Sequence, residues 1–172
     1  MKFFGNFFEP SLMPQQPSMP QVHTVLTQTA ISNMMNGVFL PIPVKRLSMK
    51  PGESCLFCDH AVSITEKLRV VGRQRLGGAF SIRIMKGLTY HTGNGGDATI
   101  RENVQEYIQG KLYITNKRII FSADSKAFQK KISDVVAYSI EESCLIIQFT
   151  NKSYRIYLPV AECADKVLEY IL

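Results

Sequence analysis

The chain has 172 residues and a formal net charge of +6, and 45% of its residues are hydrophobic. A chain of this length suits one domain with extensions and buries roughly 70% of its unfolded surface, so it needs no disulfide or metal to fold. Its four cysteines are too scattered for a disulfide scaffold. No apolar run approaches the ~20 residues that cross a bilayer. We therefore expect a cytoplasmic protein with reduced thiols.

Residues 1–20 are predicted to form an extended, proline-rich arm. The exception within the arm is a group of four phenylalanines, spaced so that they could share one face of a short helix: Phe3, Phe4, Phe7 and Phe8. Because four solvated Phe side chains are unfavourable, we expect this group to dock on its own domain or on a second copy. A membrane or partner anchor and simple disorder are the alternatives.

Residues 21–46 are predicted to form a helix and a linker. Pro20 suits a first helical position and Gly37 a C-terminal cap, which places the helix over 21–36. Its apolar stripe comprises Val22, Val25, Leu26, Ala30, Ile31, Met34 and Met35. We expect the stripe to pack on the domain that follows the linker prolines Pro41 and Pro43.

Residues 47–172 are predicted to form an antiparallel β domain that ends in a helix. Alternating apolar residues and turn signals indicate strands near 62–72, 79–86, 110–115, 117–122, 126–132, 134–140, 144–150 and 153–158. Pro159 then opens a helix over 160–171. The apolar face of this helix comprises Val160, Cys163, Ala164, Val167, Leu168 and Ile171.

The most specific run of this domain is Gly110-Lys-Leu-Tyr-Ile-Thr-Asn-Lys-Arg-Ile-Ile-Phe121. Its alternation predicts two strands joined by a turn at 115–117. Asn116 suits the turn because Asn tolerates a left-handed backbone and hydrogen-bonds locally. Upstream, Leu47-x4-Gly52-Glu53 is followed by Cys55-Leu-Phe57.

These runs resemble the GRAM and bacterial pleckstrin-homology-like (PH-like) domains, where a strand reading roughly G-x-L-x-[IL]-T-N-x-R-[ILV]-x-F recurs. The resemblance covers residues 47–172. It implies a PH-like antiparallel β-barrel or bent sheet, capped by the C-terminal helix, and a non-catalytic recognition module. An unrelated α+β sandwich is the alternative fold.

The main candidate for ligand binding is a basic segment, 67–96, which contains no Asp or Glu. Its basic residues are Lys67, Arg69, Arg73, Arg75, Arg83 and Lys86. The spacing Lys67-x5-Arg73-x-Arg75 resembles the basic motif of phosphoinositide-binding PH domains, which lies at the first hairpin. Arg presents a bidentate fork to phosphate, so we consider anion or lipid-headgroup binding, with 73–75 in the hairpin turn. The alternative is a solvated strand face.

Other motifs carry weaker signals. The Gly-rich segment 93–96 lacks the Lys-Ser/Thr of a P-loop and is predicted to be a loop. Cys55-x2-Cys58-x-His60 falls in a predicted strand, where positions i and i+3 face opposite ways, so no metal site is expected. No catalytic triad is evident, and we expect neither enzyme activity, nor a cofactor, nor nucleic-acid binding.

The sequence thus favours a module for protein interaction or self-association, using the Phe-rich arm and the helix over 21–36. Peripheral membrane contact through the basic segment is the alternative.

Overall fold

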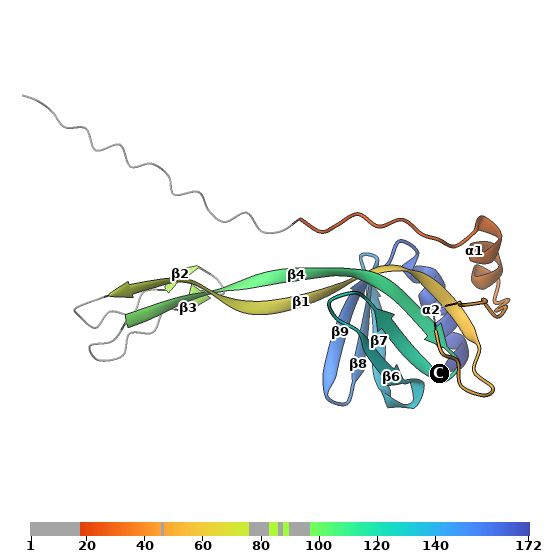
Figure 1. Cartoon of the computed structure of the whole chain (residues 1–172). Helices are drawn as coiled ribbons and strands as arrows, with labels where there is room; N and C mark the ends of the chain where they lie inside the picture. The colour runs from red at the N-terminus through yellow and green to blue at the C-terminus, as the bar shows by residue number, and fades with distance from the viewer. Residues whose placement is uncertain (1–17, 46, 76–82, 86–87, 90–96) are drawn as a thin grey trace, which may run out of the picture.

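The computed structural model describes residues 18–45, 47–75, 83–85, 88–89 and 97–172, with side chains described outside 71–100. Its centre is a seven-stranded antiparallel sheet in the order β6-β5-β4-β1-β9-β8-β7 (Figure 1). The strands are β1 (Cys55–Arg75), β4 (Asp97–Thr115), β5 (Arg118–Ser122), β6 (Phe128–Lys131), β7 (Val135–Glu141), β8 (Cys144–Phe149) and β9 (Lys152–Tyr157). Because β6 and β7 form its two edges, the sheet is not closed into a barrel.

The antiparallel sheet and the C-terminal helix are confirmed. Helix α2 (Ala161–Ile171) covers the inner face of the sheet, and Ala164, Val167 and Leu168 are completely buried there. The alternating residues of β8 behave as predicted, since Leu145 and Ile147 point into the same core. Burial of these side chains supplies the main stabilisation, at roughly 1.5–3 kcal/mol for each large apolar residue.

The N-terminal helix is shorter than the sequence predicts. Helix α1 spans Gln28–Met35 and begins after Thr27, whose hydroxyl caps the Ala30 N–H at 3.2 Å. The preceding residues are extended, because the β-branched residues among 22–27 favour extended backbone and Thr27 is a strong N-cap. Helix α1 packs on α2, burying Met34, so its apolar stripe does contact the domain.

The segment between α1 and β1 covers the outer face of the sheet. Val44, Leu47 and Met49 pack on a small cluster formed by Cys55, Tyr113 and Ile120. As a result, Arg118 and the three following residues of β5 are all buried, although a strand with one solvated face would alternate.

One hairpin turn uses left-handed backbone without glycine. Glu142 (φ 47°) and Ser143 (φ 66°) join β7 to β8, and they are the non-glycine residues with positive φ in the described part of the chain. Two such residues between paired strands match a type I′ turn. The signature turn at Asn116 does not use this conformation, so the left-handed backbone that the sequence suggested there is wrong.

Two central strands run far beyond the sheet. Among the described strands, β1 and β4 pair only with each other along residues 65–75 and 97–106, which we call the ribbon. Figure 1 shows the ribbon extending from one side of the molecule. At about 3.3 Å per residue, its reach is roughly 35 Å. A separate two-stranded sheet, β2 (Arg83–Met85) with β3 (Leu88–Thr89), lies between β1 and β4 in the chain.

Glycine is required where the ribbon enters the sheet. A Cβ at Gly110 would overlap the carbonyl oxygen of Ser122 and would lie 2.8 Å from Phe121 Cζ. The strand β5 therefore passes too close to Gly110 for any side chain, which gives a physical reason for the first residue of the signature.

We predict that Gly110→Ala lowers the free energy of unfolding by about 1–3 kcal/mol, because backbone must move to admit the methyl group. Urea unfolding measures the change. Ser153→Ala, on an exposed position of β9, is the control and should stay within about 0.5 kcal/mol of the original chain. Equal stability of the two variants would contradict the steric argument.

Candidate functional site

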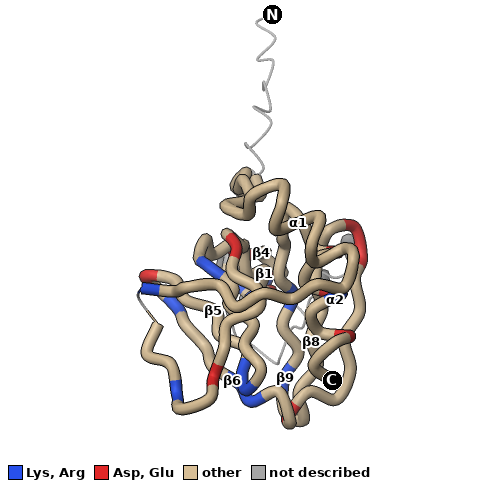
Figure 2. The backbone as a smooth tube through the Cα atoms, turned by 90° about the vertical axis from the view of Figure 1, so that its right-hand side faces the viewer, with Lys and Arg blue, Asp and Glu red and all other residues tan. Residues whose placement is uncertain are grey.

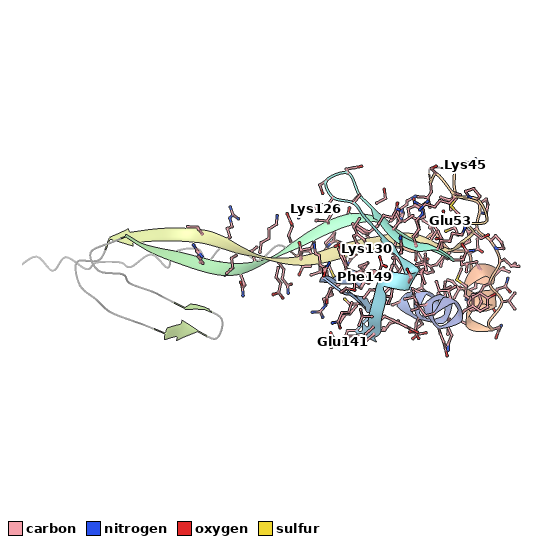
Figure 3. The ribbon with its side chains drawn as sticks, turned by 90° about the horizontal axis from the view of Figure 1, so that it is seen from below. Lys45, Glu53, Lys126, Lys130, Glu141 and Phe149 are labelled. Atoms are coloured by element: carbon pink, nitrogen blue, oxygen red, sulfur yellow. The ribbon has the colours of Figure 1, made fainter. Side chains whose placement is uncertain are left out.

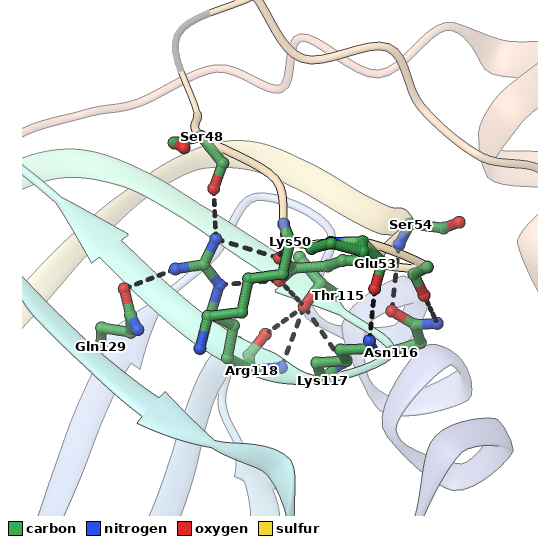
Figure 4. A network of polar contacts seen from close by, with 11 residues as sticks. Ser48, Lys50, Glu53, Ser54, Thr115, Asn116, Lys117, Arg118 and Gln129 are labelled. Atoms are coloured by element: carbon green, nitrogen blue, oxygen red, sulfur yellow. Dashed lines mark hydrogen bonds and ion pairs between the residues drawn. The ribbon is translucent and has the colours of Figure 1, made fainter.

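One buried ion pair joins the two segments that resemble GRAM domains, 47–57 and 110–121 (Figure 4). Arg118 Nε lies 2.7 Å from Glu53 Oε1, and Arg118 Nη2 lies 3.0 Å from Glu53 Oε2. The remaining donors of the guanidinium reach Gln129 Oε1 at 2.7 Å and the carbonyl of Ser48. The fork of Arg thus binds both carboxylate oxygens, a geometry that Lys cannot reproduce.

The signature turn also holds the loop before β1. Asn116 accepts a hydrogen bond from the Ser54 N–H at 3.0 Å and donates one to the Gly52 carbonyl at 3.1 Å. Lys117 Nζ donates to the Pro51 carbonyl at 2.6 Å. Asn116 and Lys117 therefore fix a loop more than 60 positions upstream, and their side chains have hydrogen-bond partners within the chain.

The environment of Glu53 strongly favours its ionised form. Burial raises the pKa of Glu53, but hydrogen bonds from Arg118, the Lys50 N–H and Thr115 outweigh it and bring the pKa from 4.5 to about 2. The Thr115 hydroxyl donates at 2.7 Å. Because every one of these partners is structural, we assign the network to stability and not to ligand binding.

The predicted basic site on β1 lies opposite acidic residues of β4, the strand that pairs with it. Lys67 Nζ lies 2.9 Å from Glu106 Oε2, and Lys126 Nζ lies 2.5 Å from the same oxygen. Lys126, labelled in Figure 3, belongs to the β5–β6 connection. Hydrogen bonds from Lys126 and then Lys67 lower the pKa of Glu106 to about 2. Arg69 stands opposite Glu102 in the register of β1 and β4.

The remaining basic candidates do not form the expected hairpin turn. Arg73 and Arg75 lie within β1, opposite Thr99 and Asp97, so the placement of 73–75 in a turn is wrong. A register shift between Val70 and Gly72 interrupts the alternation needed for one continuous basic face. Arg83 lies in the separate strand β2, and Lys86 lies outside the described residues, as does the Gly-rich segment 93–96.

Charges of both signs are interspersed over the body of the molecule (Figure 2). The basic segment by itself does not reveal the carboxylates of the ribbon, because they lie on β4, the strand that pairs with it. Glu102, Glu106 and Asp97 follow that segment in the sequence, and a hairpin prediction over 65–110 would have placed them opposite it.

The extended residues 18–27, which we call the strap, lie beside two adjoining clefts. One cleft of about 840 Å³ is lined by Ser18, Pro20 and the base of the ribbon. The other, of about 970 Å³, is lined by residues 21–25 together with His60 and parts of β4 and β5. Gln109 and Asp124 border both clefts. Sequence analysis does not predict this site, because residues 21–27 fall within the helix that it predicts over 21–36.

The cysteines are free thiols. Cys55, Cys144 and Cys163 are buried and Cys58 is half-buried, and burial raises the pKa of Cys55 to about 12. Within the described ranges, no three His, Cys, Asp or Glu side chains come together in a way that could hold a metal ion. The four arm phenylalanines, Phe3, Phe4, Phe7 and Phe8, lie outside the described residues.

Comparison with known proteins does not assign the chain to a family. No protein-family model matches the chain, and no curated protein matches it in sequence. Among the described residues, no helix is long and apolar enough to span a membrane.

We predict that Arg118→Met lowers the free energy of unfolding by about 3–5 kcal/mol, because it leaves the buried Glu53 carboxylate uncompensated. The double variant Glu53→Gln/Arg118→Met should recover part of this loss, since both charges are then absent. Urea unfolding of the three chains at about pH 7 tests both statements. A double variant no more stable than Arg118→Met would contradict them.

The same pair predicts a pH dependence. The folded-state pKa of Glu53 is about 2 against an ordinary 4.5, so its stabilising contribution is complete above pH 4.5 and disappears as the pH falls toward 2. In Arg118→Met, burial without the guanidinium reverses the direction of the shift. We therefore expect the stability difference between the two chains to shrink on acidification, measured by urea unfolding. A constant difference would contradict the assignment.

Proposed function

We propose that the chain is a non-catalytic, PH-like recognition module that mediates protein interaction or assembly. The arrangement of seven antiparallel strands followed by a helix across the inner face supports the PH-like fold. So does the contact between Glu53 and Arg118, because it joins the two segments on which the resemblance rests.

The observation that carries the interaction function is the ribbon. Within the described part of the chain, neither outer edge of the ribbon is paired with a further strand, and such edges readily accept one. Its described side chains include two exposed apolar ones, Leu68 (67% exposed) and Val70 (51% exposed). An isolated two-stranded hairpin is marginally stable in water, so a partner that adds a strand or covers a face would stabilise it.

The charge arrangement of the ribbon favours a protein partner over an anionic membrane. Lys67 is already paired with Glu106, and Arg69 and Arg75 stand opposite Glu102 and Asp97 in the register of β1 and β4. A surface of alternating sign is attracted weakly to a uniformly negative surface, whereas it suits the mixed charges of another protein. The net charge of +6 remains the argument for lipid headgroups as the second candidate.

We predict that the chain associates with itself at high concentration through the ribbon, so that light scattering gives a mass above 19.4 kDa. The double variant Leu68→Asn/Val70→Thr should return the mass to that of the monomer, because it removes the exposed apolar groups. Val136→Thr is the matched control, since Val136 is also exposed (63%) but lies on β7. A wild-type chain that stays at 19.4 kDa throughout would exclude assembly through this surface.

For the second candidate, lipid-headgroup binding, we expect the original chain not to sediment with anionic vesicles at about 0.15 M salt. Exposed charges are screened beyond roughly 8 Å at that salt concentration. Glu106→Gln frees Lys67 and Lys126 and should increase sedimentation relative to the original chain, because two cations lose their partner. Strong binding by the original chain, abolished by replacing Lys67, Arg73 and Arg75 with Ala, would instead establish the lipid-headgroup function.

A further inference from the structure

The strap lies on the domain as an extended segment without a strand partner. Its residues alternate in burial: Pro20, Val22, Thr24 and Leu26 are half-buried, and the residues between them are exposed. Such a period of two is the pattern of an extended chain with one face against a surface. No β-ladder includes it among the described strands, so the strap is held by side chains and a few polar contacts.

The main polar contact of the strap is with a completely buried carboxylate. Asp59 Oδ1 accepts the N–H of Val25 at 2.8 Å and the N–H of His60 at 2.8 Å. Its second oxygen, Oδ2, has no hydrogen-bond partner among the described residues. A nearby contact joins His60 Nδ1 to the carbonyl of His23 at 3.1 Å.

A buried carboxylate is costly in a core unless N–H or O–H groups surround it. Asp59 occupies an inward position of β1 between Phe57 and Ala61, where an apolar residue would pack without this cost. What Asp59 contributes at that position is an acceptor for the main-chain N–H of a segment that crosses β1. This is a means of recognising extended backbone, independent of the side chains of that segment.

The surface under the strap is larger than the strap. The two clefts of about 840 and 970 Å³ lie along it, and their walls come from β1, β4 and β5 as well as from the strap itself. The contact is therefore incomplete, because close-packed protein contacts leave few voids larger than a water molecule. A longer or bulkier extended segment would fill this space better than the strap does.

We propose that the strap occupies, within its own chain, a groove that binds an extended peptide segment of a partner protein, and that such a segment displaces the strap. The matching segment has apolar or β-branched residues at alternate positions and a free main-chain N–H opposite Asp59. This inference rests on the proposed interaction function but assigns it a second surface, which adjoins the ribbon at Leu68 and continues over β4 and β5.

The local structure allows the strap to leave without unfolding the domain. The strap ends at Thr27, the N-cap of α1, and α1 is held separately by its packing on α2. The aromatic pair Phe39–Tyr170, with ring centroids 4.6 Å apart, holds the segment after α1 against α2. Displacement therefore moves only the residues before Thr27.

The test uses the full chain and a fluorescent peptide of residues 18–27 as the probe. In the variant Val22→Asp/Val25→Pro, the strap loses an inward apolar group and the N–H that Asp59 accepts. Because the strap competes as a linked ligand at high effective concentration, we expect this variant to bind the probe at least about tenfold more tightly than the wild-type chain. A matched peptide with Pro in place of Val25 should bind more weakly than the probe.

Equal binding of the probe by the variant and the wild-type chain, or equal binding of the two peptides, would overturn the proposal. If the variant fails to fold, amide exchange in the wild-type chain replaces it: excess probe should accelerate exchange at the Val25 N–H, and unchanged exchange overturns the proposal. Self-association through Leu68 and Val70 is measured separately. Loss of peptide binding with that association intact overturns the groove alone, and the reverse result overturns the ribbon alone.

Discussion

The ion pair between Glu53 and Arg118 fixes the point at which the chain enters its sheet. The carboxylate comes from the loop before β1 and the guanidinium from the start of β5, and both are almost completely buried. Burying two charges requires that their hydrogen bonds be satisfied, and here Thr115, Gln129 and the backbone of 48–50 complete the set. Entry into β1, the turn between β4 and β5, and the cover over the outer face therefore form one unit.

Much of the fold follows from local pattern. The helix α2 and the hairpin of β8 and β9 were predictable because their apolar residues repeat with periods of 3.6 and 2, respectively. The turn at Asn116 was predictable because its polar residues separate two apolar runs. The conformation of 20–27 was not, since Val22 and Leu26 satisfy a helical stripe and an extended alternation equally well. In the structure this segment is extended, and its Val25 N–H contacts Asp59. Local periodicity in the sequence contains no information on such a long-range contact.

The candidate sites show the same limit. The sequence places Lys67 on a strand, as the structure does. However, the charge of Lys67 is paired with Glu106, nearly 40 positions away, and Glu106 also pairs with Lys126. The signature itself marks stability more than ligand binding: Gly110, Thr115, Asn116 and Arg118 all make contacts inside the chain. The surfaces proposed for recognition are the ribbon and the groove under the strap, and the wall of that groove includes Lys111 and Tyr113 of the signature.

The ribbon has a geometric consequence of its own. Its strands, β4 and β1, are neighbours at the middle of the sheet, and β6 and β7 form the two edges. Inserting two residues into each strand of the ribbon would lengthen it by about 7 Å and leave every core contact in place. The distance that the ribbon spans from the body can thus change by small insertions, independently of the stability of the domain.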